Sequence, residues 1–156
     1  MKQSSDYSAT FVVDNTPQEA FDAITNVRGW WSGEIDGDTD KLGAEFTYRY
    51  QDIHYSRQRV TELIPDARVV WLVVDSQLNF VDVKNEWTGT TVIFEIGTEG
   101  DKTRVRFTHV GLVPGHECYS DCSNAWGSLI RGNLRRLITS GQDQPNAFAA
   151  KASGNR

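Results

Sequence analysis

The stretch 102-KTRVRFTHVGLVPGHECYSDCSNAWGSLIRGNLRRLITS-140 decides the fold of this chain, because it joins a strand-like run to a long helix-like segment. Residues 118–140 have the periodicity of an amphipathic helix with one apolar side. That side carries Cys122, Ala125, Trp126, Leu129, Ile130, Asn133 and Leu137, and the opposite side carries Asn124, Ser128, Arg131 and Arg135. Such a helix needs an apolar surface to cover, and the runs that precede it predict that this surface is a sheet.

A strand and two short helices are predicted at the start of the chain. Alternating residues indicate a strand at Ser8–Asp14. Asn15 or Thr16 is a suitable helix cap, and Pro17 suits the first helical position. We expect a second short helix or turn within Thr25–Trp31.

Six further strand-like runs follow these helices, and turn residues separate most of them. They are Ile35–Asp38, Glu45–Gln51, Tyr55–Ile64, Arg68–Ser76, Thr90–Gly97 and Lys102–Val110, whereas Gln77–Gly89 is expected to be a long loop or irregular strand at the rim of a cavity. This order predicts an α+β helix-grip fold, in which a curved antiparallel sheet of six to seven strands wraps around the long C-terminal helix. We expect residues 7–141 to form a single domain, residues 1–6 a flexible N-terminus and residues 142–156 a disordered tail.

The composition narrows the classes of partner. The chain has 16 Lys and Arg against 21 Asp and Glu and a net charge of −5, which disfavours nucleic acid and membrane surfaces as partners. No run approaches the roughly 20 apolar residues of a membrane span, and residues 1–6 lack the apolar centre of a signal peptide. Cys118 and Cys122 are too far apart on the predicted helix for a disulfide unless its first turn unwinds. We therefore expect a cytoplasmic protein in a reducing compartment.

Residues along Tyr7–Ser140 carry a resemblance to a known family. They are Phe11, Val13, Pro17, Glu19, Ala20, Phe21, Trp30, Trp31, Gly43, Phe46, Val60, Glu62, Leu63, Pro65, Val70, Trp71, Phe94, Glu95, Ile96, Thr103, Val105, Phe107, Thr108, His109, Gly111, Leu112 and Trp126. Their order and spacing resemble the homologues of the activator of the ninety-kilodalton heat-shock protein ATPase, within the START-like or birch-pollen-allergen-like superfamily called SRPBCC. The resemblance implies the helix-grip fold and a hydrophobic cavity for an apolar or amphipathic small molecule. It implies no catalytic set, and the family's name makes a chaperone a candidate partner.

Nine residues are predicted to line this cavity. The walls are Tyr48, Tyr50, Trp71, Phe94, Phe107, Trp126 and Ile130, and the polar contacts are His109 and Asn133. His109 either contacts a ligand, as a donor or a base, or has its ring satisfied by a backbone carbonyl or a neighbouring side chain. The amide of Asn133 needs a partner within the apolar side of the helix, and this is either a ligand or pocket water, or a strand side chain.

Other side chains of reactive type have two interpretations each. Glu62 and Glu86 are either general bases with a pKa raised by desolvation or solvated carboxylates at the rim. His116, Cys118, Asp121 and Cys122 have metal-ligand residue types, and the two cysteines either belong to a zinc site or fill space under the start of the helix. Their spacing favours the second interpretation, and we predict no metal and no cofactor. The chain contains no GxGxxG, phosphate-binding, GxSxG or HExxH motif.

Three functions are therefore considered. The leading hypothesis is a small cytoplasmic protein, without catalytic activity, that binds an apolar or amphipathic molecule beneath the C-terminal helix. The second is a cyclase or hydrolase that uses the same cavity, with His109 and a carboxylate as acid and base. The third is a module that contacts a chaperone or another protein through the outer surface of its sheet.

Overall fold

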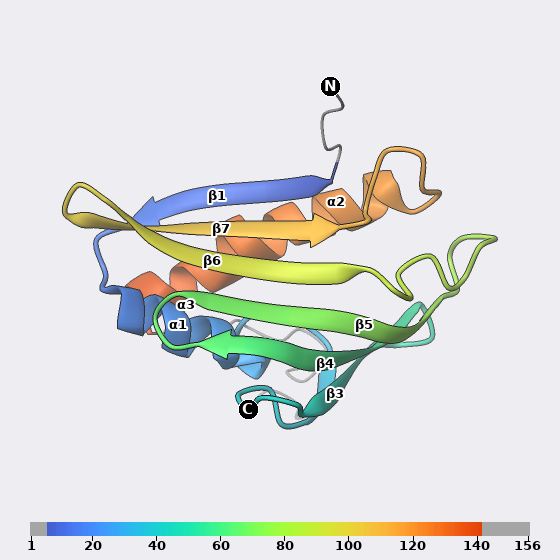
Figure 1. The fold of residues 1–156 in the computed structure, drawn as a ribbon. Helices are drawn as coiled ribbons and strands as arrows, with labels where there is room; N and C mark the ends of the chain where they lie inside the picture. The colour runs from blue at the N-terminus through green and yellow to red at the C-terminus, as the bar shows by residue number, and fades with distance from the viewer. Residues whose placement is uncertain (1–5, 142–156) are drawn as a thin grey trace, which may run out of the picture.

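A computed structural model describes residues 6–141 of the chain, and Figure 1 shows a curved sheet with a long helix lying along its inner side. The strands are β1 (Tyr7–Val13), β2 (Glu34–Gly37), β3 (Glu45–Tyr50), β4 (His54–Ile64), β5 (Arg68–Leu78), β6 (Thr91–Glu99) and β7 (Lys102–Val110). All neighbours are antiparallel, in the order β1-β7-β6-β5-β4-β3-β2. The predicted α+β helix-grip fold is confirmed. Residues 1–5, and the expected disordered tail at 142–156, lie outside the described residues.

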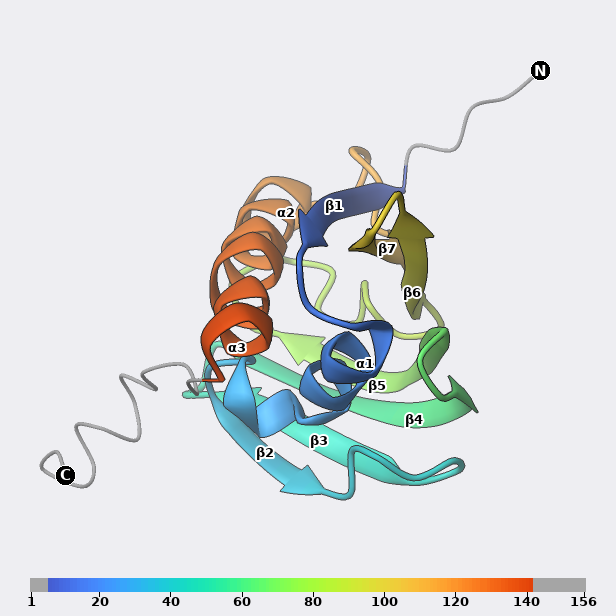
Figure 2. The same cartoon turned by 90° about the vertical axis from the view of Figure 1, so that its left-hand side faces the viewer.

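Two short helical elements connect β1 to β2, as the sequence predicted. The first, α1 (Pro17–Thr25), begins with a capping box: the Thr16 hydroxyl accepts from the Glu19 N–H at 3.1 Å, and the Glu19 carboxylate accepts from the Thr16 N–H at 3.0 Å. The second, η1 (Val27–Gly29), is a single 3-10 turn. In Figure 2, α1 lies on the inner side of the sheet beside the C-terminal helix, where it packs mainly against β6.

The C-terminal helix is continuous but not uniform. It consists of α2 (Tyr119–Gly127), a π-helical segment η2 (Ser128–Leu134) and α3 (Arg135–Ser140). Its buried residues include Cys122, Trp126, Ile130, Leu134 and Ile138, which are spaced four apart. In a regular α-helix, each step of four residues rotates about 40° more than one full turn. Four such steps add up to about 160°, so Ile138 would lie on nearly the opposite side of the helix from Cys122.

The wider turn of η2 removes much of this rotation, because a π-helix closes its hydrogen bonds five residues apart. One side of the helix therefore stays against the sheet along its whole length. The predicted apolar side assumed regular α-helical geometry and was partly wrong: Ala125 is exposed, and Leu129 and Asn133 are half-buried.

Aromatic rings fill the centre of the molecule between sheet and helix. The indoles of Trp30, Trp31 and Trp71 are nearly parallel, with ring centroids 5.8 to 6.3 Å apart. Phe94 meets Trp71 edge-on at 5.1 Å and Phe107 at 5.2 Å. Edge-on and offset arrangements of this kind are the favoured ones for aromatic pairs. The middle of the expected cavity is therefore closely packed.

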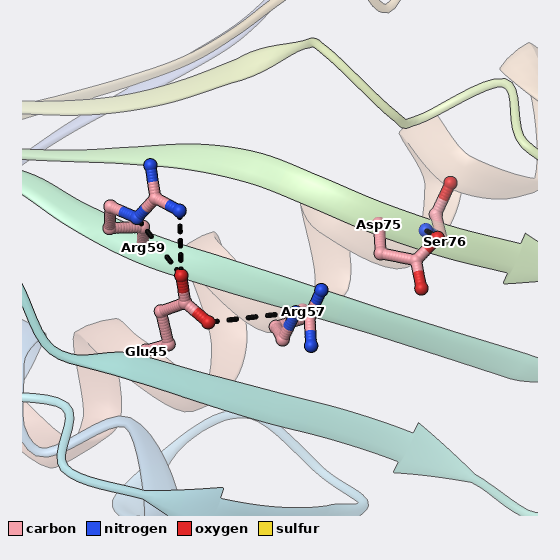
Figure 3. Close-up of polar contacts among 5 residues, drawn as sticks. All are labelled: Glu45, Arg57, Arg59, Asp75 and Ser76. Atoms are coloured by element: carbon pink, nitrogen blue, oxygen red, sulfur yellow. Dashed lines mark hydrogen bonds and ion pairs between the residues drawn. The ribbon is translucent and has the colours of Figure 1, made fainter.

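The outer face of the sheet is charged. Figure 3 shows Glu45 of β3 between two arginines of β4, with the Arg59 side chain 2.8 Å and the Arg57 side chain 3.6 Å from its carboxylate oxygens. Asp75 of β5 lies in register with Arg57, and its carboxylate accepts from the backbone N–H of Ser76 at 3.0 Å. This face is open to solvent, so its ion pairs contribute little to stability. Within residues 6–141, no helix is long and apolar enough to cross a bilayer.

Candidate functional site

A pocket of about 500 Å³ opens at one end of the packed core. Four parts of the chain surround it: the segment after η1, the β3–β4 hairpin, the long β5–β6 connection and the C-terminal helix. Its floor is formed by Trp31, Tyr48, His54, Trp87, Cys122 and Trp126, and its mouth by Tyr50, Ile53, Phe80, Ala125 and Leu129. The polar side chains Ser32, Asp121, Ser128 and Asn133 complete the lining. A pocket of this size and character suits a small organic molecule.

The floor is a set of contacting aromatic rings. Trp31 stacks on Tyr48 with centroids 4.0 Å apart, and Trp87 lies parallel to Trp126 at 5.7 Å. The two pairs meet where Trp31 approaches Trp126 at 5.2 Å. Because each ring is held by its neighbours, the floor is rigid and needs little ordering when a ligand binds.

The mouth exposes apolar side chains. Tyr50 is 37% exposed, Phe80 38% and Ile53 42%. They come from two different connections, at the β3–β4 hairpin and after β5, and they are gathered here around one opening. Apolar residues at the entrance of a pocket provide area that a ligand can cover.

His54 places an imidazole ring on the floor. Its ring stands edge-on between Tyr48 at 5.0 Å and Trp87 at 4.5 Å, and its buried Nε2 atom has no hydrogen-bond partner among the described residues. Burial lowers the pKa of His54 from 6.5 to about 3, so the ring is neutral at physiological pH. A buried nitrogen without a partner costs about 1–3 kcal/mol, and a ligand that supplied a partner would recover part of this cost.

His109 lies behind the floor, and both of its ring nitrogens are engaged. Its Nδ1 accepts from the Trp126 indole N–H at 3.0 Å, and its Nε2 is 2.8 Å from the Thr90 hydroxyl. That hydroxyl donates to the backbone carbonyl of Trp87, so Nε2 carries the ring proton and donates to Thr90. Burial lowers the pKa of His109 to about 3, with smaller electrostatic contributions from the imidazoles of His116 and His54. The neutral ring thus connects the helix to the β5–β6 connection.

A model of the family described as Activator of Hsp90 ATPase homolog 1-like protein matches residues 14–139 of this chain. The chain belongs to this family. The solution structure of the Aha1 dimer from Colwellia psychrerythraea has the same fold, with a TM-score of 0.70 and 22% identity over 87% of this chain and 97% of that one. No curated protein sequence matches the chain.

Two further solved structures share the fold of this chain. DynU16, from the dynemicin biosynthetic locus, has a TM-score of 0.64 and 15% identity over 90% of this chain and 49% of its own. CalU16 from Micromonospora echinospora has a TM-score of 0.61 and 15% identity over 94% of this chain and 80% of its own. At this level of identity, the likeness shows the fold alone.

The nine predicted cavity residues divide into two groups in this family member. Tyr48, Tyr50, Trp126 and Asn133 line the pocket. Trp71, Phe94, Phe107, His109 and Ile130 are completely buried in the packed core and do not line the pocket. The division arises because strand alternation and the helix periodicity direct these side chains toward the interior, whereas ring packing decides which part of the interior stays open.

The two polar side chains among these nine have internal partners. Asn133 donates from its amide nitrogen to the Trp30 carbonyl at 3.0 Å, and its oxygen accepts from Arg136 at 3.3 Å. The observed partner, a backbone carbonyl directly after η1, is neither the strand side chain nor the ligand or water that the sequence suggested. His109, with Trp126 and Thr90 on its nitrogens, has the neighbouring side-chain partners of the second interpretation.

The two candidate carboxylates have different positions. Glu62 lies near the C-terminal end of β4, outside the pocket lining, and its carboxylate accepts from Arg68 at 2.8 Å. Glu86 accepts from the backbone N–H groups of Glu117 at 2.8 Å and Cys118 at 3.1 Å. In return, Glu117 accepts from the N–H groups of Asp82 and Val83 at 2.9 and 3.0 Å. Glu86 and Glu117 thus clamp the β5–β6 connection to the segment before α2, which fixes one rim of the pocket.

The cysteine cluster packs beneath the start of α2. Cys118 and Cys122 are both buried, and hydrogen bonding to Cys118, with burial, raises the pKa of the Cys122 thiol. A raised pKa keeps this sulfur protonated, and metal ligation needs the thiolate. Within residues 6–141, no three side chains of His, Cys, Asp or Glu gather closely enough to hold a metal ion.

The sequence analysis missed several floor residues, above all Trp31, His54 and Trp87. The signal for His54 was present, because His54, Ser56 and Gln58 alternate along β4 and place polar side chains on the inner face. Polar residues at positions that should be apolar often mark a functional site. The predicted strand began at Tyr55, one residue too late to include His54. Trp87 had no usable signal, because it lies in a connection without periodicity.

Proposed function

We propose that this protein binds an apolar or amphipathic small molecule in the pocket beneath its C-terminal helix. The observation that carries this proposal is the combination of an open volume of about 500 Å³ with a rigid aromatic floor and the unpartnered Nε2 of His54. Burial of apolar ligand surface against the rings supplies the affinity, at roughly 25 cal/mol per Å² before ordering costs. The His54 nitrogen, a polar atom on a mainly aromatic floor, orients the ligand.

The experiment is a binding screen by NMR with lipids, aromatic polyketides and sterol-like compounds. The chain has five tryptophans, and their indole N–H signals report on two environments. Trp31, Trp87 and Trp126 line the pocket, whereas Trp30 and Trp71 are buried outside it. A ligand in the pocket shifts the first three signals more than the other two. If no compound class shifts them, the proposal fails.

A pair of helix variants controls for the place of binding. Ala125 is an exposed pocket residue, so Ala125→Phe fills the mouth without removing any core contact. Asn124→Phe adds the same ring one residue away, on a side chain outside the lining. Binding that survives in Asn124→Phe and weakens at least about tenfold in Ala125→Phe, a change of about 1.4 kcal/mol, supports the pocket. Equal affinity in both variants would place the ligand elsewhere.

The family's name also makes a chaperone a candidate partner, and we propose a cytoplasmic location for the protein. The charged outer face of β3–β5 is the surface that such a partner would meet, because Arg57, Arg59 and Glu45 are solvent-exposed there. A pull-down with the host chaperone, followed by its ATPase assay, tests this role. Neither of the engaged nitrogens of His109 is free to act as a base, so no observation favours the cyclase or hydrolase alternative.

A further inference from the structure

The lining of the pocket carries negative charge. Of the residues that line it within the described part of the chain, Asp121 is the only one with a full charge, since His54 is neutral. Six lining side chains are aromatic: Trp31, Tyr48, Tyr50, Phe80, Trp87 and Trp126. Burial raises the pKa of Tyr48, so its hydroxyl is also uncharged. A ligand therefore meets a carboxylate, ring faces and neutral polar groups.

More carboxylates surround the Asp121 end of the pocket. The clamp described above brings Asp82, Glu86 and Glu117 to the rim formed by the β5–β6 connection and the start of α2. One lysine, Lys84, lies in the same connection, where its ammonium donates to the Val81 carbonyl at 3.0 Å. With Asp121, four acidic residues and one lysine lie at this rim within the described part of the chain. The resulting field is negative and attracts cations.

The opposite end of the pocket differs in charge. Arg136 donates to Asn133 there, from a position outside the lining. Asp121 and Asn133 are separated by about 18 Å along the helix axis, at the usual rise per residue. At that distance, beyond a Debye length of about 8 Å in physiological salt, Arg136 does not cancel the field at Asp121.

The aromatic floor adds to this preference. The faces and hydroxyl groups of aromatic side chains carry partial negative charge, and a cation near a ring face gains about 0.5–2 kcal/mol. An anionic headgroup would find no Lys or Arg among the lining residues and would lie beside Asp121. Fatty acids and other anionic amphipaths are therefore disfavoured, while organic cations are favoured.

We propose that the pocket selects organic cations, meaning a ligand with an apolar body on the aromatic floor and an ammonium group at the Asp121 end of the mouth. This inference rests on the proposed ligand-binding function and specifies its ligand class. Asp121 pairs with the ammonium group, and the clamp carboxylates strengthen the field around it. The neutral His54 leaves the floor without a repelling charge.

Three probes with one tail and different headgroups test the selection: octyltrimethylammonium, octyl glucoside and octyl sulfate, each below its micelle concentration. Calorimetry gives the affinities, and the indole signals of Trp31, Trp87 and Trp126 confirm the location. The ammonium probe is expected to bind about tenfold or more tightly than the sulfate, with the glucoside between them. Because exposed charges are screened, the difference shrinks when salt rises from about 20 to 300 mM.

Two variants separate a local contact from total charge. Asp121→Asn is expected to weaken the ammonium probe about two- to fivefold, the range for a solvent-exposed pair, and to leave the glucoside unchanged. Asp101→Asn makes the same charge change in the β6–β7 turn, away from the pocket, and is expected to leave all three affinities unchanged. Equal binding of all three probes, tighter sulfate binding or equal effects of the two variants would overturn the cation preference alone. Failure of every probe to bind would overturn the ligand-binding function with it.

Discussion

Two histidines that face the interior, the buried His109 and the half-buried His54, make the stability of the fold sensitive to mild acid. Burial lowers the pKa values of His54 and His109 from 6.5 to about 3. Between pH 6.5 and about pH 3 the histidines of the unfolded chain take up protons, whereas those of the folded chain do not. The stability that depends on neutral histidines is therefore complete above pH 6.5 and decreases as the pH falls toward 3. From pH 7 to pH 5, each histidine is expected to remove about 2 kcal/mol, and the pair about 4 kcal/mol.

The variant His54→Phe isolates half of this effect. Among residues 6–141 the Nε2 atom of His54 has no hydrogen-bond partner, and its ring is held by Tyr48 and Trp87, so phenylalanine removes no hydrogen bond seen at that atom. We expect stability close to that of the natural chain at pH 7, and a loss of about 2 rather than about 4 kcal/mol between pH 7 and pH 5. Urea unfolding followed by tryptophan fluorescence at pH 7, 6 and 5 measures both values.

Acidic side chains do not obscure the comparison. A hydrogen bond from Lys102 lowers the pKa of the Asp14 carboxyl, and one from the Thr16 backbone lowers the pKa of the Glu19 carboxyl. Both carboxylates therefore favour the folded state at pH values above the pKa values of the unfolded chain. That contribution is present in both proteins and cancels in their difference. A stability of the natural chain that stays constant between pH 7 and pH 5, or an equal acid loss in His54→Phe, would refute the reasoning.

Three other predictions concern stability alone. Thr90→Val leaves the buried Nε2 proton of His109 without an acceptor and should lower the free energy of unfolding in urea by about 1–3 kcal/mol. Thr90→Ser keeps the hydroxyl and should retain most of that free energy. Equal losses in the two variants would contradict the role of the hydroxyl. Glu86→Gln weakens two backbone contacts of the clamp and should raise amide exchange at Glu117 more than in β7; unchanged exchange would show that the carboxylate is not needed. In Gly132→Ala the added Cβ meets no atom within 4 Å, so the variant should stabilise the folded protein by up to about 1 kcal/mol. In Gly29→Ala the added Cβ lies 2.8 Å from a Leu137 methyl, so the variant should destabilise it. Thermal melts of both variants measure the two effects.

The order of elements could be predicted from the sequence because each element carried its own local signal. The β7 boundaries, Lys102–Val110, agree with the expectation, since the strand alternates cleanly and lies between turn residues. The β5 strand runs to Leu78, two residues beyond the predicted end, because its pairing with β4 continues into the aperiodic segment. Local patterns thus predict where elements lie, and neighbouring strands decide where they end.

The open part of the interior could not be predicted from the same patterns. Trp71 and Tyr48 both alternate onto the inner face, yet of these two only Tyr48 lines the pocket, because the parallel indoles of Trp30 and Trp31 and the ring of Phe46 close the space around Trp71. Which rings stack depends on contacts between residues far apart in the chain. The π-helical segment could not be predicted from local patterns either, because packing against the sheet determines which side of the helix carries Ile138.

The pairing of β1 with β7 has a consequence for the assembly of the protein during synthesis. Tyr7 lies opposite His109, and Val13 lies opposite Thr103. The strand β1, which is synthesised first, therefore has no neighbouring strand in the sheet until β7 has been synthesised. Contacts between such distant parts of a chain form slowly, because a large loop must close first. We therefore expect nascent chains that stop before β7 to leave β1 unpaired and available to chaperones, and the closing of this edge to be a late event in folding.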